Sequence, residues 1–279
     1  MYSYAYYNGS FGKKDDISIP LSDRSIYFGD AIYDAAIGSY DRILWENEHI
    51  ERFLLNAKRI GISHDFSAEH LSSLLREIAV KSMLDCYFIY FQMSRGLPNR
   101  IHSSEGARAN LLITVDPIII DSPSKRLNLI TVSDKRFGYC NIKTTNLLPS
   151  VIASTKAEKA GCDEAIFVRG KYVTECAKSN ISIINQGRVI THPTNNRILP
   201  GIARAHLLTI CGALNIPCYE QPFTVKEMLS ADEILVTSTT KLCKSVETIN
   251  GHSVGGKNRV LTDNICEMMY YEFRKTCRI

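Results

Sequence analysis

Apolar residues recur every three or four positions in several stretches of the chain, which is the spacing of one face of a helix. Helices are therefore predicted near residues 47–61, 67–79, 149–161, 201–214, 224–229 and 261–275. Ser67 is a residue type that caps helix N-termini, Pro149 is tolerated in a first helical turn, and Gly61 suits the end of a helix.

Other stretches alternate apolar and polar residues, or are short runs of β-branched and aromatic residues, as strands are. Strands are predicted near residues 17–21, 35–40, 87–93, 110–115, 127–132, 164–168, 172–175, 181–184, 189–191, 218–221 and 234–236. Asn8-Gly9 and Asn185-Gln186-Gly187 carry residues typical of hairpin turns. The chain thus mixes helices with strands, and we find no internal repeat.

Residues 118–125 follow neither pattern and include Asp121-Ser122-Pro123-Ser124. A stretch without periodicity and with turn-forming residues is a candidate linker between domains. We therefore predict a smaller N-terminal domain over residues 1–119 and a larger C-terminal domain over residues 120–279.

The composition is that of an ordinary globular protein, with 45% apolar and 22% charged residues. No apolar run approaches the roughly 18 residues that span a bilayer. The N-terminus lacks the basic and then apolar segments of a secretory signal. The net charge of +4 is scattered, so neither a membrane nor a nucleic-acid partner is expected.

Cysteine and histidine usage bounds the chemistry further. The nine cysteines are odd in number and form no CxxC pair, which argues against a disulfide framework and a zinc ribbon. The seven histidines form no HExxH motif, so no metal site is predicted. Free thiols suit a reducing compartment, and we predict a cytoplasmic protein.

Lys143 lies among small, polar and apolar residues near the middle of the chain, in Cys140-Asn141-Ile142-Lys143-Thr144-Thr145-Asn146. Most lysines are solvated surface charges, and the local sequence alone favours that interpretation. The alternative is an amine kept partly dry, which could attack a carbonyl.

Two stretches have features of anion sites. Pro200-Gly201-Ile202-Ala203 begins a predicted helix, where backbone N–H groups favour a phosphate, and Thr237-Ser238-Thr239-Thr240 follows a predicted strand. Each feature is common in proteins without such a role. Together with Lys143, and with Glu175 as a possible partner for a pyridinium nitrogen, they would suit pyridoxal 5′-phosphate.

These residues belong to a longer series of motifs in which the chain resembles the class-IV (fold-type IV) pyridoxal-phosphate-dependent aminotransferases, and among them the bacterial D-amino acid aminotransferases. The motifs run along nearly the whole chain in this order: Asp23-Arg24 with Phe28-Gly29-Asp30-x-x-Tyr33, Glu48-His49-Ile50-x-Arg52, Tyr90-Phe91-Gln92-x-x-Arg95-Gly96, Arg100-x-His102, Ile142-Lys143-x-x-Asn146-Leu147-Leu148, Gly161-Cys162-x-Glu164-Ala165-Ile166, Thr174-Glu175-x-x-x-Ser179-Asn180, Ile198-Leu199-x-Gly201-Ile202-x-Arg204 and Val236-Thr237-Ser238-Thr239-Thr240.

The resemblance implies an α+β fold of the fold-type IV kind, with two α/β-type domains and pyridoxal 5′-phosphate in the cleft between them. It implies that Lys143 forms the Schiff base with the cofactor and then carries the proton between substrate and cofactor. It also implies that Glu175 pairs with the pyridine nitrogen. The other implied cofactor-binding residues are Arg52, Ser179, Leu199, Ile202, Ala203, Ser238 and Thr239.

Arg100-Ile101-His102 is the motif that discriminates within the family. In the D-amino acid enzymes such a pair reaches into the site of the partner subunit and, with a tyrosine that matches Tyr33, binds the substrate carboxylate. A guanidinium suits this task because it binds a carboxylate through two parallel hydrogen bonds. The resemblance therefore implies a homodimer, with Tyr90 as a further substrate-binding residue.

The implied activity is that of a D-amino acid transaminase. D-Alanine and 2-oxoglutarate would give pyruvate and D-glutamate in two half-reactions through pyridoxamine phosphate. Branched-chain L-amino acid aminotransferases and aminodeoxychorismate lyases share the lysine and the acid, so they are the alternatives. The chain departs from the D-enzyme pattern at Ala203, where threonine is usual, at Phe137 in place of tryptophan, and at residues 176–178 in place of a run of serines.

Overall fold

The computed structural model describes residues 3–96, 100–103 and 106–278. By packing, the chain forms two compact units. The first contains Met1–Ile119, Ile142–Asn146 and Arg274–Ile279, and the second contains Ile120–Asn141 and Leu147–Phe273. Lys143 thus belongs to the first unit, although the residues on both sides of its short segment belong to the second.

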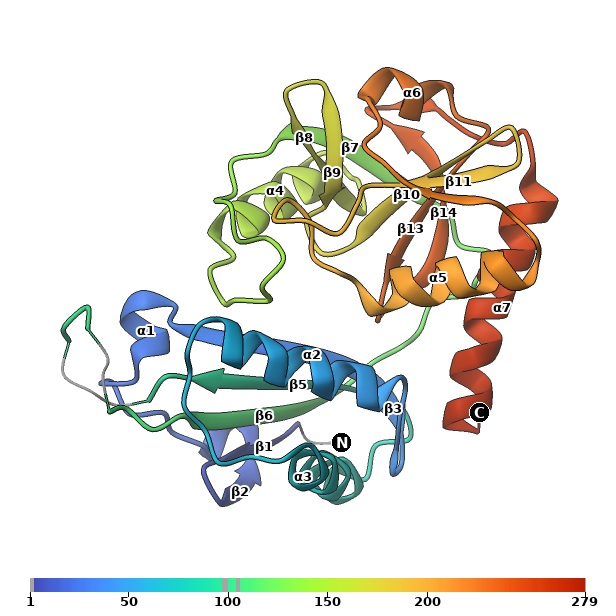
Figure 1. The fold of residues 1–279 in the computed structure, drawn as a ribbon. Helices are drawn as coiled ribbons and strands as arrows, with labels where there is room; N and C mark the ends of the chain where they lie inside the picture. The colour runs from blue at the N-terminus through green and yellow to red at the C-terminus, as the bar shows by residue number, and fades with distance from the viewer. Residues whose placement is uncertain (1–2, 97–99, 104–105, 279) are drawn as a thin grey trace. The chain divides into compact units, whose positions relative to one another are not determined.

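The first unit is built on a six-stranded sheet with the order β2-β1-β6-β5-β3-β4 (Figure 1). Neighbouring strands are antiparallel, and they are β1 (Tyr4–Tyr7), β2 (Ser10–Lys13), β3 (Ala31–Ser39), β4 (Arg42–Ile43), β5 (Tyr87–Ser94) and β6 (Asn110–Pro117). The predicted hairpin turn is confirmed, because Asn8 and Gly9 join β1 to β2 with positive φ angles.

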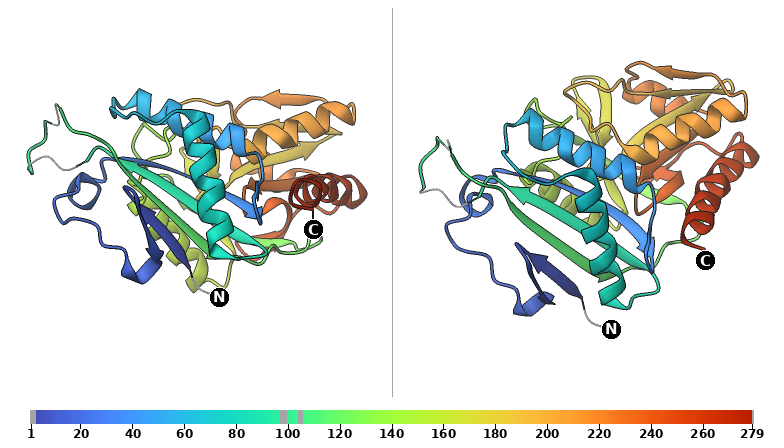
Figure 2. Two further views of the ribbon diagram at one scale, coloured as in Figure 1. Left: turned by 90° about the horizontal axis from the view of Figure 1, so that it is seen from below. Right: turned by 60° about the horizontal axis from the view of Figure 1, so that its bottom comes forward.

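Helices cover one face of this sheet. They are α2 (Glu46–Arg59), which packs on β3, and α3 (Ala68–Ser82), which packs on β1, β5 and β6 (Figure 2). Ser67 caps α3 as predicted, since its hydroxyl accepts a hydrogen bond from the His70 amide. The buried apolar side chains of both helices and of alternate strand positions, such as Phe53 and Phe91, form one core.

The strand predicted at residues 17–21 is wrong. This segment follows a short 3-10 helix, η1 (Lys14–Asp16), has no strand structure, and leaves Leu21 largely exposed. It is followed by a helix that was not predicted, α1 (Arg24–Phe28). Asp23 caps the N-terminus of this helix, because its side chain accepts a hydrogen bond from the Ser25 amide. Two features explain why residues 17–21 do not form a strand. Pro20 has no backbone N–H to donate to a neighbouring strand, and the Asp23 cap favours a helix directly after this segment.

The second unit contains a nine-stranded sheet with the order β12-β11-β10-β13-β14-β7-β8-β9 and with β15 paired to β14. Its strands are β7 (Leu127–Ser133), β8 (Glu164–Arg169), β9 (Tyr172–Cys176), β10 (Asn180–Asn185), β11 (Arg188–Thr191), β12 (Cys218–Glu220), β13 (Glu233–Ser238), β14 (Leu242–Ile249) and β15 (His252–Ser253). Its helices are α4 (Leu148–Lys159), α5 (Ile202–Ala213), α6 (Val225–Ser230) and α7 (Arg259–Cys277), the last of which ends in the first unit.

Strand β14 was not predicted, because its sequence carries Lys244 between buried residues. The Lys244 side chain is only 1% exposed, and its Nζ donates to the carbonyls of Asp121 and Ser122 at 2.9 and 2.6 Å. Burial lowers the pKa of Lys244 below its ordinary value. Two backbone acceptors thus replace water around a charge that the apolar pattern alone would place at the surface.

None of the helices in the described part of the chain combines the length and the apolar character needed to cross a bilayer.

Candidate active site

The segment Ile142–Asn146 runs beside the first half of β3. The Tyr33 amide donates to the Lys143 carbonyl at 2.8 Å, and the Thr145 amide donates to the Ala31 carbonyl at 3.1 Å. Thr144 forms an isolated bridge with Ile32. The backbone of Lys143 is therefore held against a sheet, which fixes the point from which its side chain leaves.

The Lys143 side chain is half-buried against aromatic rings. Its Nζ lies 4.3 Å from the ring centroid of Tyr33, and this ring stacks on that of Tyr90 at 5.2 Å. The Tyr90 hydroxyl donates to Gln92 at 2.6 Å, and burial raises the pKa of Tyr90 well above its ordinary value. The amine therefore has partly apolar surroundings, as the second interpretation of Lys143 requires.

On the opposite face of β3, Asp34 holds two basic side chains of α2. Its carboxylate accepts from Arg52 Nε and Nη2, both at 2.8 Å, and lies 2.8 Å from His49 Nδ1. Burial disfavours the charge of Asp34, but Arg52 and His49 outweigh that effect and bring the pKa of Asp34 well below its ordinary value. Because His49 and Arg52 are three residues apart on a helix, one carboxylate reaches both.

The His49 ring is buried beside this carboxylate. Burial lowers its pKa below the ordinary histidine value, and the attraction of Asp34 offsets this only in part. With Nδ1 directed at Asp34, its buried Nε2 has no hydrogen-bond partner among the described residues.

Arg100 and His102 are exposed on the first unit. The Arg100 guanidinium lies 5.5 Å from the ring centroid of Tyr27, and the His102 ring lies 5.3 Å from that of Phe28. Both side chains are thus presented by the loop after β5 and supported by α1.

In the second unit, Glu175 lies at the end of β9 and is buried. Its carboxylate forms an ion pair with Arg136 and accepts from Asn180 Nδ2 and from the Leu199 amide, both at 3.0 Å. Arg136 in turn pairs with the buried Asp134 at 3.0 Å. These contacts fix the direction of the Glu175 carboxylate.

Asn180 also connects Glu175 to the start of α5. Its Nδ2 donates to the Leu199 carbonyl at 2.9 Å, and a Cβ at Gly201 would collide with its Oδ1. Gly201 is the N-cap residue of α5 and has no side chain that could accept from the first amides. No described side chain caps this helix, so the amides of Ile202 and Ala203 have no side-chain acceptor. Such amides favour an anion.

The end of β13 lies on the other side of Asn180, which is paired with Thr237. Ser238 and Thr239 follow directly, and the Ser238 hydroxyl accepts from the Lys241 amide at 3.2 Å. The buried Thr237 hydroxyl has no hydrogen-bond partner within the described residues. Through Asn180, strand pairing thus brings Glu175, the start of α5 and the Ser238–Thr239 turn together.

Ser179 is a predicted site residue whose hydroxyl hydrogen is donated within the second unit. Its hydroxyl donates to the buried Glu164 at 2.8 Å, and Lys241 binds the same carboxylate oxygen at 2.8 Å. We therefore expect Ser179 to hold the chain at β10 rather than to offer a hydrogen to a ligand.

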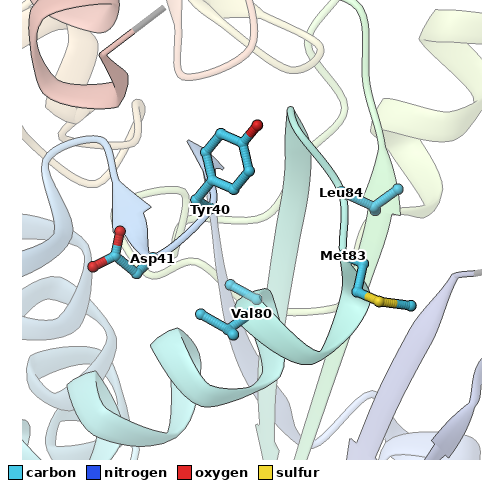
Figure 3. A pocket seen from close by; sticks show the side chains of 6 residues that line it. Tyr40, Asp41, Val80, Met83 and Leu84 are labelled. Atoms are coloured by element: carbon cyan, nitrogen blue, oxygen red, sulfur yellow. The ribbon is translucent and has the colours of Figure 1, made fainter.

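A pocket of about 370 Å³ lies elsewhere on the first unit, beyond the far end of β3 (Figure 3). It is lined by Tyr40, Asp41, Ala79, Val80, Met83 and Leu84. None of the predicted site residues lines it, and its only carboxylate has no basic partner in the lining. We do not assign a reaction to it.

Sequence comparison places the chain in a family. The profile of the amino-transferase class IV family matches residues 32–249, so the chain belongs to this family of aminotransferases. It is 35% identical over 267 residues to a D-alanine aminotransferase of Staphylococcus aureus, which covers 94% of this chain and 95% of that protein.

Solved structures show the same fold. A branched-chain aminotransferase from Thermoproteus uzoniensis with norvaline has a TM-score of 0.87 at 24% identity, covering 96% of this chain and 93% of the other. A branched-chain amino acid aminotransferase from T.th. with pyridoxamine 5′-phosphate has a TM-score of 0.88 at 18% identity, covering 99% and 98%. The α+β, fold-type IV prediction and the aminotransferase prediction are confirmed.

Enzymes of this family depend on pyridoxal phosphate, as predicted. The residues of the chain fit this group, which has a carbonyl, a pyridine nitrogen and a phosphate. The first unit offers the Lys143 amine over the ring of Tyr33, which stacks on Tyr90. The second unit offers the oriented Glu175 carboxylate beside helix amides with no side-chain cap. The unsatisfied hydroxyl of Thr237 lies next to the latter group.

Sequence reasoning missed Asp34, His49, Asn180 and Arg136 as parts of these two groups. The spacing of His49 and Arg52 on one helix face was the signal for the first two. Asn180 stands in the motif Thr174-Glu175-x-x-x-Ser179-Asn180, but the motif did not reveal its role, which depends on strand pairing across a long stretch of sequence.

Proposed function

We propose that this aminotransferase acts on D-amino acids and converts D-alanine and 2-oxoglutarate to pyruvate and D-glutamate in two successive half-reactions. The observation that carries the proposal is the similarity to D-alanine aminotransferases over nearly the whole chain. The Arg100-x-His102 motif supports it, because this pair distinguishes the D-amino acid enzymes within the family.

The cofactor, when bound, supplies a carbonyl that takes up the amino group and a ring that accepts the electron pair of the substrate Cα. Lys143 would hold the cofactor through its amine, as the Schiff-base lysine, and its Nζ would move the proton to and from Cα. Glu175 would bind the pyridine nitrogen, with Arg136 and Asn180 fixing its orientation.

The phosphate would be bound by Arg52, by the amides of Ile202 and Ala203, and by Thr239. Ala203 retains the amide that this role needs, while a threonine there would add a hydroxyl. Leu199, Ser179 and Ser238 would complete the surroundings of the cofactor, Ser179 through its bond to Glu164.

Tyr33 and Tyr90 would face the substrate, with Arg100 and His102 contributed to the site of the partner subunit of a homodimer. The exposure of both side chains on their own unit is compatible with such a role. Arg100 would bind the α-carboxylate, and the position of that carboxylate decides which enantiomer presents its Cα hydrogen to the lysine. All nine cysteines are free thiols, which suits the cytoplasmic location that we also propose.

A half-reaction assay tests this function. The absorbance band of the bound cofactor is followed after the addition of D-alanine, D-glutamate, L-leucine or L-valine, each without an oxo acid. We expect the D-amino acids to bleach the band and the L-amino acids to leave it. Bleaching by L-leucine but not by D-alanine would overturn the D-amino acid assignment in favour of a branched-chain L-aminotransferase.

A pair of lysine variants tests the role of Lys143. Lys143→Ala should lose the band of the covalently held cofactor and lower the rate by at least about a thousandfold. Lys156→Ala, at an exposed position of α4, should keep both. A Lys143→Ala protein with the normal band would refute the role of this lysine.

A further inference from the structure

Arg24 is a buried arginine in α1, only 4% exposed, and it binds the backbone of the loop that carries Arg100 and His102. Its Nη1 donates to the Ile101 carbonyl at 2.5 Å, and its Nη2 donates to the His102 carbonyl at 3.0 Å. Its Nε donates to Asp30 at 2.7 Å. One guanidinium therefore uses three nitrogens on three separate acceptors.

The support beneath Arg24 is itself held firmly. Asp30 also binds Arg95 at 2.8 Å, and Arg95 donates to the carbonyls of Ile60 and Gly61 at the end of α2. Asp23, which begins α1, accepts from Ser94 and Asn110 of the sheet, both at 2.7 Å. Through these contacts the position of α1 is determined by the sheet and by α2.

Phe28, at the other end of α1, provides a second contact with the same loop. Its ring centroid lies 4.5 Å from the Arg24 guanidinium carbon, 5.3 Å from the His102 ring and 5.8 Å from the Arg100 guanidinium carbon. Arg24 thus binds the backbone of residues 101 and 102, and Phe28 contacts the side chains of Arg100 and His102. Both side chains nevertheless remain exposed.

We propose that Arg24 is a positioning residue for substrate recognition, which holds residues 101 and 102 by their carbonyls and so sets the direction of Arg100 and His102. The proposal rests on the substrate-binding role of that pair in the proposed function. Lysine cannot replace Arg24, because a single ammonium nitrogen cannot reach acceptors that surround a planar guanidinium.

Arg24→Lys and Arg24→Gln test this role in the cofactor-loaded enzyme. We expect the KM values for D-alanine and for pyruvate to rise at least tenfold, since both carry the carboxylate, while kcat falls less than threefold and the cofactor band is unchanged. Arg76→Gln removes an arginine that pairs with Glu46 far from this loop, and it should match the wild type. KM values within twofold of the wild type in both Arg24 variants would overturn the proposal.

Hydrogen–deuterium exchange provides a measurement that depends neither on activity nor on access to Arg100 in the dimer. If Arg24 holds residues 101 and 102, the peptide that contains them should take up deuterium at least fivefold faster in Arg24→Lys than in the wild type or Arg76→Gln, as measured by mass spectrometry. Equal exchange rates would overturn the proposal even if Arg24→Gln failed to fold. Faster exchange in an enzyme without D-alanine activity would preserve the hold on the loop and refute the proposed substrate instead.

Discussion

Asp34 is the buried charge on which Arg52 and His49 depend. It is 0% exposed, and its carboxylate binds both residues at 2.8 Å. Removing one partner of a buried ion pair leaves the other charge buried without an opposite charge. The resulting loss of stability is larger than the net stabilisation that the intact pair provides. The carboxylate is therefore important for stability as well as for the direction of Arg52.

Asp34→Asn should lower the free energy of unfolding at pH 7 by about 3 kcal/mol, as measured by urea denaturation. The folded pKa of Asp34 is below the unfolded value of about 3.9, so its contribution is present above that pH and is lost as the pH falls through the folded pKa. The difference between variant and wild type should thus narrow from pH 5 to pH 3. Lys125→Gln breaks an exposed pair with Asp121 and should change stability by less than about 0.5 kcal/mol. An equal loss in both variants would contradict this account.

At this scale, residue type points to some candidate site residues and not to others. Lys143 and Glu175 were singled out because an amine and an acid have recognisable chemistry. Asn180 and Asp34 were not, because their contacts arise from strand pairing and from the helix that packs on β3. Such contacts join residues far apart in sequence. The spacing of His49 and Arg52 indicates a shared helix face, but it does not identify the carboxylate that binds both side chains.

Gly29 joins two elements, since it ends α1 and contacts the segment that carries Lys143. Its φ is +57°, and its carbonyl accepts from Asn146 Nδ2 at 2.9 Å and from Thr145 Oγ1 at 3.1 Å. A Cβ at this position would lie 2.6 Å from Asn146 Oδ1. Only glycine satisfies both the backbone conformation and this close approach.

Gly29→Ala should therefore destabilise the protein more than the backbone conformation alone explains. Gly61→Ala is the matched control in the same unit, with a φ of +67° and its nearest neighbour, Arg95, at 3.9 Å from the new Cβ. We expect a left-handed alanine to cost about 1–2 kcal/mol in either variant. Gly29→Ala should cost at least about 1 kcal/mol more in thermal unfolding, because Asn146 must move. Equal losses of stability in the two variants would show that Asn146 can move away from the new Cβ without cost.

Among the elements, helices and turns with local signals were predicted best. Ser67, Pro149 and the Asn8-Gly9 hairpin act within a few residues, so their effect is visible in the sequence. The prediction of a strand at residues 17–21 was wrong, because alternating apolar residues form a strand only where a neighbouring strand is available for pairing. Strand β14 was missed because carbonyls from a distant loop satisfy Lys244.

At the scale of the whole molecule, α4 presents the apolar surface expected of an interface. Leu148, Val151 and Ile152 lie three and four residues apart and are 69%, 56% and 49% exposed. Three exposed apolar side chains on one helix face are typical of a protein contact. We expect this face to pack against a second copy of the chain in the proposed homodimer.

Val151→Glu combined with Ile152→Glu should shift the protein towards the monomer, because burying two charges at an interface is unfavourable. Sedimentation velocity at several concentrations measures this shift. Leu229→Glu changes an apolar residue of similar exposure on α6 and should leave the dimer intact. A double variant that sediments as the wild-type dimer would exclude α4 from the interface, and a monomeric wild type would refute the homodimer.

The position of Ile142–Asn146 beside β3 also has a consequence for the order of synthesis. The ribosome releases β3 more than a hundred residues before the segment that lies along its outer edge, and residues 274–279 of the same unit come last. Until residues 142–146 have been synthesised, the first half of β3 has unpaired backbone groups at that edge, and other chains can pair with them. The edge along which a growing chain could aggregate is thus covered by the peptide that carries Lys143.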